Sequence, residues 1–280
     1  MDAAEVRRAN IVDDNVCRVY SMKNVHSIII VILIGASAVL FSEGHVTAQA
    51  EREIELTAQE ILARVDRIMG YPDGILKGYM MHITPDGSSQ KLQITGYINK
   101  NQFLFDIVKP ARGSIQKILY RLGGEDMWVY DMAARALFHK MGVDKFDDIL
   151  ATNFYYIDLS NADLQSNYVA RIDGSVILKN QDCYKLTLDP IDKTGAYGKL
   201  TLYVIKQNYI PLRIDYHDQD KVIFKTLSIA KVGQKDGKTF PVRYDMLNIK
   251  KGTMTVLEFT TIEDGVAFNA EMFRPEKLGD

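Results

Sequence analysis

The sequence predicts a mainly β protein built on one large antiparallel sheet, strongly curved or closed, with helices on one face. Three observations carry this prediction. Short apolar runs with a period of two recur from Ile75 onward, turn residues separate them at close spacing, and one long helical pattern precedes them. We expect about eleven strands, covered by an N-terminal helix and short central helices.

The stretch from Tyr197 to Val232 shows the strand pattern most clearly. Leu200 and Leu202 alternate with their neighbours in its first run, and Leu212 and Ile214 do so in its second. A period of two places successive side chains on opposite faces of a strand. The links between runs are short, so neighbouring strands must be antiparallel, because a parallel pair needs a long crossover. We therefore expect a meander whose apolar face a second sheet, a helix or a ligand must cover.

The amino terminus has the pattern of a secretory signal peptide. A basic segment begins at Met22, an uncharged apolar run covers Ile28–Phe41, and Ala48-Gln49-Ala50 supplies an Ala-x-Ala cleavage site. The alternative is an uncleaved membrane anchor, but the apolar run is shorter than the ~20 residues that a spanning helix needs. We expect a signal peptide at residues 22–50 with cleavage after Ala50.

Residues 1–21 are polar and of mixed charge, so they fit neither a signal peptide nor a core. We expect that translation begins at Met22 and that the mature protein is a single domain, residues 51–280. The whole chain carries 34 Lys and Arg against 36 Asp and Glu, a balance that gives no reason to expect a nucleic-acid partner. Cys183 is the one cysteine after the leader, and its strand-like surroundings indicate a small buried apolar residue.

The first element of the mature chain is an amphipathic helix at Ala58–Met69. Thr57 and Glu60 have the spacing of a capping box, and Gly70 follows the helix. Its apolar residues fall on one helical face. They are Ile61, Leu62, Val65, Ile68 and Met69.

Nearly all of the remaining chain is predicted as strand. The expected strands before the middle of the chain are Ile75–Thr84, Gln90–Asn99, Gln102–Lys109, Ile115–Leu122, Met127–Tyr130 and Arg135–Lys140. Those after it are Tyr168–Ile172, Ser175–Lys179, Cys183–Leu188, the three runs of the meander, Phe240–Ile249 and Thr253–Ile262. Asp144–Leu150 and Tyr155–Leu164 are predicted as short helical segments between the two sets.

Sequence motifs for the common catalytic chemistries are missing. The chain has no Gly-x-Ser-x-Gly elbow, Walker loop or dinucleotide fingerprint. Asp215, His217, Asp218 and Asp220 cluster near one turn, but a solvated hairpin tip is the better interpretation than a metal site, which needs converging ligands. We predict no catalytic residue, no metal site and no cofactor.

Several segments, each weak by itself, occur in a specific order and spacing that together cover nearly all of the mature chain. They are the signal peptide, Gln59–Asp66, Gly96–Lys100 before Phe103–Ile107, Gly123–Asp131, Leu159–Asp163, Tyr197–Asp218 and Met272–Pro275. In the order and spacing of these segments, the chain resembles the LolA-like outer-membrane lipoprotein-sorting proteins, a periplasmic family.

The resemblance implies an incomplete, curved antiparallel barrel closed by helices around an apolar cavity. LolA-like proteins take acylated lipoproteins from an inner-membrane transporter and pass them across the periplasm. The implied partners are therefore an acylated lipoprotein or a lipid, and an inner-membrane transporter. One departure concerns the lid, because the family has an Arg-Pro pair where this chain has Lys100-Asn101-Gln102. Control of the lid by a basic residue is therefore not carried over to Lys100.

The leading hypothesis is a periplasmic carrier that binds acyl chains in an apolar cavity. The residues predicted to line the cavity are Phe103, Phe105, Leu119, Trp128, Leu200, Leu202, Leu212 and Ile214. The residues predicted to form the lid are Ile61, Val65, Ile68, Phe146 and Leu150. This choice depends on strand parity, since a shift of one residue exchanges the two faces.

Two alternatives remain open at this stage. One is a periplasmic interaction or sensor module on the same scaffold without lipid cargo, which a dry and fully packed core would favour. The other is a hydrolase, which the missing nucleophile motif disfavours.

Overall fold

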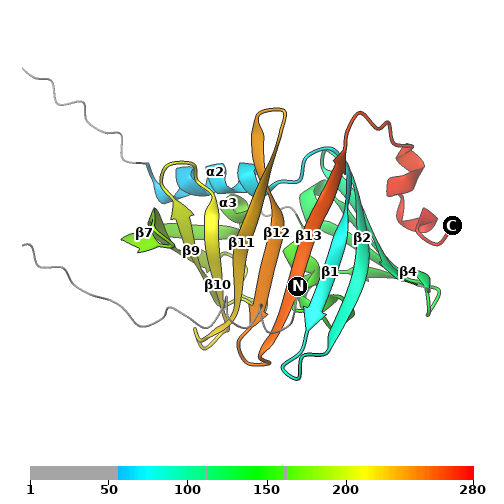
Figure 1. Ribbon diagram of the computed structural model, residues 1–280, viewed down its shortest axis with the longest axis horizontal. Coiled ribbons are helices and arrows are strands. Elements are labelled where there is room, and N and C mark those ends of the chain that lie inside the picture. The colour runs from blue at the N-terminus through cyan, green and yellow to red at the C-terminus, as the bar shows by residue number, and fades with distance from the viewer. Residues whose placement is uncertain (1–55, 111, 161–162) are drawn as a thin grey trace, which may run out of the picture. The chain divides into compact units, whose positions relative to one another are not determined.

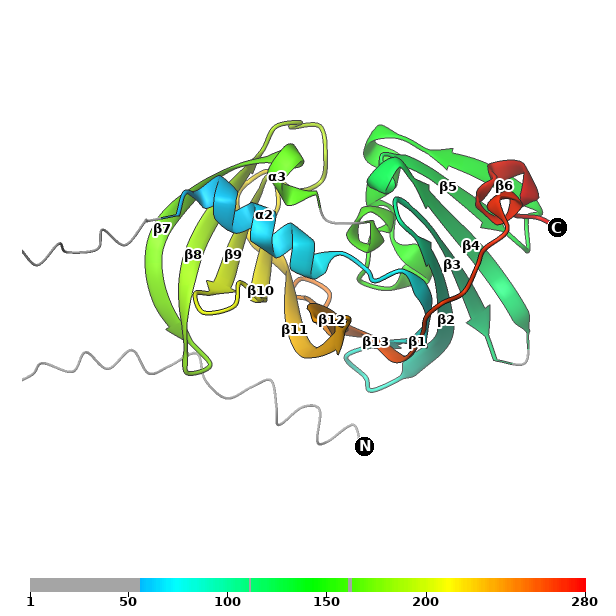
Figure 2. The ribbon, with the colours of Figure 1, turned by 90° about the horizontal axis from the view of Figure 1, so that it is seen from above.

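The computed structural model describes residues 56–110, 112–160 and 163–280, and their strands form one 13-stranded antiparallel sheet. The sheet is open, with β6 and β7 at its two edges, and it curves around the elements on its inner side (Figures 1 and 2). The predicted fold class, a curved antiparallel sheet or incomplete barrel with few helices, is confirmed. The predicted leader and its cleavage site lie outside the described residues.

The sheet is made in two passes. The first six strands run outward from the centre to one edge: β1 (Gly74–Ile83), β2 (Ser89–Asn99), β3 (Gln102–Lys109), β4 (Gly113–Arg121), β5 (Asp126–Asp131) and β6 (Ala136–Lys140). The chain then crosses to the other edge and returns through β7 (Tyr168–Leu178), β8 (Gln181–Pro190), β9 (Lys199–Ile205), β10 (Pro211–His217), β11 (Ile223–Lys235), β12 (Lys238–Asn248) and β13 (Thr253–Glu263). Pairing of β13 with β1 joins the two passes at the centre.

The sheet has 13 strands, more than the expected count of about eleven but one fewer than the fourteen runs named from the sequence. The two runs predicted at Tyr168–Ile172 and Ser175–Lys179 are one strand, β7, which continues through a register shift between Ile172 and Gly174. Gly174 has a φ of 135°, a conformation that favours glycine, so the sequence feature that resembled a turn is a β-bulge.

The two faces of the sheet have separate hydrophobic cores. Alternate residues such as Phe103 and Phe105 on β3 belong to the large core on the concave face, together with α2 (Ala58–Met69). Leu104, between them, faces the other way and packs with Leu119 against the C-terminal residues Phe273 and Leu278. The C-terminal 3₁₀ turns, η5 (Ala270–Phe273) and η6 (Pro275–Lys277), therefore cover part of the convex face.

Helix α2 is the main helical cover of the concave face. The predicted capping box is present: the Glu60 amide donates to Thr57 Oγ1 (3.2 Å), and the Thr57 amide donates to Glu60 Oε2 (2.8 Å). Figure 2 shows α2 lying along the inner side of the second-pass strands, and it contacts both β7 and β12. No helix within the described ranges is long and apolar enough to cross a membrane.

Gly78 marks a close approach between the two central strands. A Cβ atom added there would lie 1.9 Å from the carbonyl oxygen of Glu258 on β13, and the pairing register shifts between Lys77 and Gly78. Backbone cannot yield as a flexible side chain can, so any larger residue at this position must push the two strands apart.

We predict that Gly78→Ala lowers the free energy of unfolding by about 1–3 kcal/mol, the usual cost of overpacking. Chemical denaturation of both proteins measures the change. Gly70→Ala is the control, because its added Cβ would lie an ordinary 3.5 Å from the Asp66 carbonyl oxygen. Equal stabilities for the two variants would contradict the strand contact.

Candidate functional site

The site is built around the segment that crosses the concave face between the two passes of the sheet. This central segment, residues 142–167, contains the 3₁₀ turns η2 (Gly142–Phe146), η3 (Ile149–Ala151) and η4 (Tyr156–Leu159) and the short helix α3 (Leu164–Asn167). Residues 161–162 within it lie outside the described part of the chain. The two predicted helical segments thus correspond to 3₁₀ turns and a single helical turn.

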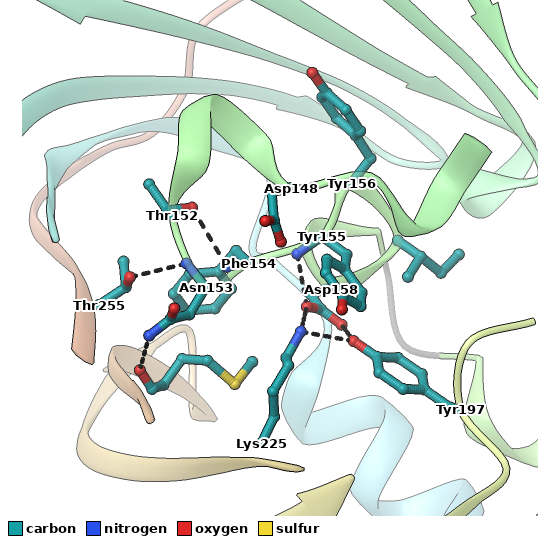
Figure 3. A network of polar contacts seen from close by, with 12 residues as sticks. Asp148, Thr152, Asn153, Phe154, Tyr155, Tyr156, Asp158, Tyr197, Lys225 and Thr255 are labelled. Atoms are coloured by element: carbon teal, nitrogen blue, oxygen red, sulfur yellow. Dashed lines mark hydrogen bonds and ion pairs between the residues drawn. The ribbon is translucent and has the colours of Figure 1, made fainter. Parts of the chain in front are cut away.

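Asn153 fixes the central segment to the ends of β12 and β13. Its side-chain amide donates to the carbonyl oxygens of Met246 (3.0 Å) and Thr253 (2.8 Å), and its backbone amide donates to Thr255 Oγ1 (3.0 Å; Figure 3). Asn153 is 1% exposed, so these bonds are shielded from water. A buried polar group that loses its hydrogen-bond partner destabilises the folded state, so the loss of any of these bonds should lower the free energy of unfolding.

A buried ion pair fixes the next turn to β11. Lys225 Nζ lies 2.9 Å from Asp158 Oδ2 and 2.9 Å from the Tyr197 hydroxyl, and the two charged side chains are 0% and 4% exposed. The Tyr197 hydroxyl donates to Asp158 Oδ1 (2.6 Å), and the Tyr155 amide donates to Asp158 Oδ2 (2.8 Å; Figure 3). The ammonium group also lies 3.5 Å from the centre of the Tyr155 ring.

This arrangement satisfies the polar groups that it buries. Both oxygens of Asp158 accept hydrogen bonds, and the ammonium of Lys225 has a carboxylate, a hydroxyl and an aromatic face as partners. Burial lowers the pKa of Lys225, while the charge of Asp158 and its hydrogen bond oppose that shift. Neither charge of the pair is therefore left without a partner inside the concave core.

A cavity of about 330 Å³ lies between the sheet, the central segment and α2. Its deep part is formed by side chains from three neighbouring central strands: Leu227 on β11, Tyr244 on β12 and Leu257 on β13, each at most 5% exposed. Further apolar side chains form its walls. They include Met69, Tyr71, Phe146, Phe154, Ile157, Leu159, Leu164, Tyr168, Tyr197, Leu200, Ile214 and Tyr216.

The cavity reaches the surface between two rims. One consists of α3 and the loop at residues 190–195, which meet through a hydrogen bond from the Ile191 amide to the Asn167 carbonyl (3.0 Å). The other is η2, where the ring of Phe146 packs edge-on against Tyr197 with centroids 5.3 Å apart. A Cβ atom added to Gly195 would lie 2.5 Å from the Phe146 ring, so the two rims touch there.

The structure places five predicted cavity residues on the concave face. Leu200 and Ile214 line the cavity itself. Phe103, Phe105 and Leu202 belong to the same core but lie outside the cavity lining. Phe103 and Phe105 instead pack against the ring of Tyr71, with centroids 6.0 and 5.5 Å away, and Tyr71 itself lines the cavity. The two phenylalanines therefore support a cavity wall without lining it.

The three other predicted cavity residues lie elsewhere. Leu119 and Trp128 are on the convex face, where the C-terminal turns cover them, so their predicted side of the sheet is wrong. They are opposite each other on β4 and β5, and thus share the same parity error. Leu212 lies at the register shift between Pro211 and Arg213 and belongs to neither hydrophobic core.

The predicted lid residues are also divided. Ile61 and Val65 are fully buried on the face of α2 that packs against the sheet, whereas Ile68, on the same helix, is partly exposed and outside the large core. Phe146 lines the cavity, and Leu150 packs against the core at the left-handed turn of η3. Prediction missed Met69 as a lining residue, although the sequence had placed it on the apolar face of the helix.

One other expectation is corrected. Asp215 and His217 are not at a solvated hairpin tip: they are 1% and 6% exposed, and bond to Thr226 Oγ1 (2.9 Å) and Thr201 Oγ1 (3.0 Å), respectively. Lys100 is exposed in the turn between β2 and β3. The basic residue that binds the central segment is Lys225 on β11, through its ion pair with Asp158.

A family model described as "Uncharacterized protein" matches residues 99–280. The chain belongs to that family. Its fold is LolA-like. A domain assigned as an outer-membrane lipoprotein-sorting protein, from Vibrio parahaemolyticus, matches with a TM-score of 0.71 and 22% identity, covering 80% of this chain and 98% of that one.

Two further solved structures share the fold. A LolA superfamily protein from Nitrosomonas europaea matches with a TM-score of 0.67 and 22% identity, over 80% of this chain and 100% of that one. A DUF1329 family protein from Desulfovibrio piger matches with a TM-score of 0.69 and 21% identity, over 79% of this chain and 97% of that one. No curated protein matches the sequence.

We predict that Lys225→Met destabilises the protein by about 3–5 kcal/mol, because it leaves the Asp158 carboxylate buried without its counter-charge. Lys250→Met is the matched control: its partner is Asp218 at 2.7 Å, but Lys250 is 60% exposed, and exposed pairs contribute about 1 kcal/mol or less. Urea denaturation compares the variants. Similar losses for both would show that the buried pair does not hold the central segment.

Asp66 connects the helical cover to α3. Its two carboxylate oxygens accept from the amides of Leu164 (3.0 Å) and Gln165 (2.9 Å). Desolvation nevertheless dominates and raises the pKa of Asp66 to about 6, with a smaller contribution from the charge of Asp163. A carboxyl group whose pKa is higher in the folded than in the unfolded state makes stability fall as pH rises between the two values.

We therefore predict that the stability of the wild type relative to Asp66→Asn falls as the pH rises from about 4 to 7, because the wild type must then ionise a half-buried carboxyl group. Denaturation at a series of pH values measures the difference. Asp192→Asn is the control, since the pKa of Asp192 is lowered and its titration lies below this window. A difference that rises with pH would contradict the assignment.

Proposed function

We propose that this protein is a periplasmic carrier that binds the acyl chains of lipoproteins or lipids in its cavity for transfer toward the outer membrane. The observation that carries the proposal is the cavity of about 330 Å³ in the concave core of a LolA-like fold. Its volume lies at the lower end of the ~300–1,000 Å³ typical of ligand pockets.

The chemistry of the lining supports an apolar ligand. The deep side chains are aliphatic or aromatic, and the buried charges beside them, Lys225 and Asp158, are paired with each other. An acyl chain that enters this space leaves water, which is favourable by ~0.8 kcal/mol per buried methylene group. Binding without a catalytic step is sufficient for this role.

The proposed route follows from the predicted leader. A signal peptide at residues 22–50 would deliver a mature domain, residues 51–280, to the periplasm. There it would receive an acylated lipoprotein or lipid, with an inner-membrane transporter as the donor. The alternative, an interaction or sensor module without lipid cargo, requires no cavity, and the space at Leu227 and Leu257 favours the carrier.

We predict that Ile214→Phe weakens binding of a fluorescent acyl probe at least tenfold, because the larger side chain fills the space that the acyl chain would occupy. Fluorescence titration of the mature protein, after removal of co-purified lipid, measures the affinity. Thermal unfolding shows whether the variant remains folded.

Trp128→Phe is the control for this experiment. Trp128 was a predicted cavity residue but lies on the convex face, so its replacement should leave probe affinity unchanged. Loss of binding in the Trp128 variant but not in the Ile214 variant would place the ligand on the wrong face for this proposal. No binding by the wild type would favour the interaction module.

A further inference from the structure

The size and shape of the cavity limit what it holds. A methylene group occupies somewhat less than the ~30 Å³ that a water molecule takes in the liquid, so a cavity of about 330 Å³ holds on the order of a dozen methylene groups. That is the length of one medium acyl chain. A lipid with two or three long chains has several times as many methylene groups.

The cavity also has an apolar end and a polar end. Its buried end is closed by Leu227, Tyr244 and Leu257, which stand side by side on β11, β12 and β13. Asp163, Asn167, Asp192 and Thr194 contribute polar side chains at the exposed rim. A charged head placed at the buried end would lose its water without gaining a charged partner, because Asp158 and Lys225 already pair with each other and Tyr197 bonds to both.

The side chains around the buried end cannot easily move apart. Leu227 and Leu257 project from central strands that are paired on both sides, and Leu257 lies opposite both Met80 and Tyr244. The central segment closes the cavity on the side opposite the sheet, and it is held by Asn153 and by the ion pair of Asp158. The length of chain that fits is therefore set by fixed side chains.

The geometry points to a ligand with a single acyl chain, inserted tail first, whose length limit is set by Leu227 and Leu257. The head remains at the rim formed by α3 and residues 190–195. This inference rests on the proposed carrier function and specifies its ligand: one chain of about 12 carbons occupies the cavity at a time. A lipid or lipoprotein with more chains would place only one of them inside.

A series of lysophosphatidylcholines with chains of 8 to 16 carbons tests this, each used below its micellar concentration with the lipid-free mature protein. Affinity should rise about fourfold per added methylene, as expected for full burial, and should level off near 12 carbons. Native mass spectrometry should show one lysolipid per protein. Continued increase up to 16 carbons would overturn the length limit.

Dioctanoyl phosphatidylcholine has the same head and a second chain. It should bind no more than a few-fold more tightly than the eight-carbon lysolipid, since the second chain stays outside. An affinity gain of a hundredfold or more would show that both chains are buried and would overturn the single-chain inference while leaving the carrier function intact. Failure of the wild type to bind any member of either set would instead refute the carrier function itself.

Two variants test the residues that set the limit. Leu257→Phe should move the break point to chains about one carbon shorter, and Leu227→Ala should move it to chains about two to three carbons longer, in proportion to the volume that each substitution fills or frees at the buried end. Leu247→Phe is the control, since Leu247 is 40% exposed and outside the cavity lining. An unchanged break point in both folded variants would overturn the assignment.

Discussion

The buried ion pair between Lys225 and Asp158 holds the central segment against β11, and the cavity lies between that segment and the sheet. Taking two charges out of water is costly, and a buried pair is retained only when its geometry and extra hydrogen bonds offset that cost. Here Tyr197 and Tyr155 supply those bonds. The pair, with Asn153 at the other attachment point, makes the crossing segment a fixed wall over the concave face.

A wide sheet with few helical residues explains why space remains. Thirteen strands present a long concave face, whereas α2 has 12 residues and α3 has four. The first-pass strands are covered by aromatic packing around Phe103, Phe105 and Tyr120, and by the central segment, through the bond from Tyr120 to the Tyr156 carbonyl (2.7 Å). Around Leu227 and Leu257 the cover is thinner, and a cavity is left.

The sequence was informative where a local rule was decisive. The bounds of α2 follow from the capping box at Thr57 and the apolar spacing, and the strands follow from their alternation. Parity was correct for Leu200 and Ile214, whose opposite face carries polar residues such as Thr201 and Asp215.

Parity failed on β4 and β5 because both faces of these strands are apolar. Ile118 and Leu119 are both fully buried. Ile118 belongs to the large core on the concave face, and Leu119 belongs to the smaller core on the convex face, which the C-terminal turns cover. No local pattern could show that Phe273 and Leu278 return to cover Leu119. The pairing of Asp158 with Lys225 is equally non-local, because 67 residues separate them in the chain.

Methyl NMR of the protein with a spin-labelled acyl chain tests the central claim most directly, namely that the acyl ligand lies inside the concave core. The label, placed near the end of the chain, should broaden the methyl signals of Leu200, Leu227 and Leu257, which surround the cavity. The signals of Leu104 and Leu119 on the convex face should remain sharp. Broadening of the convex set alone, or of neither set, would contradict the account.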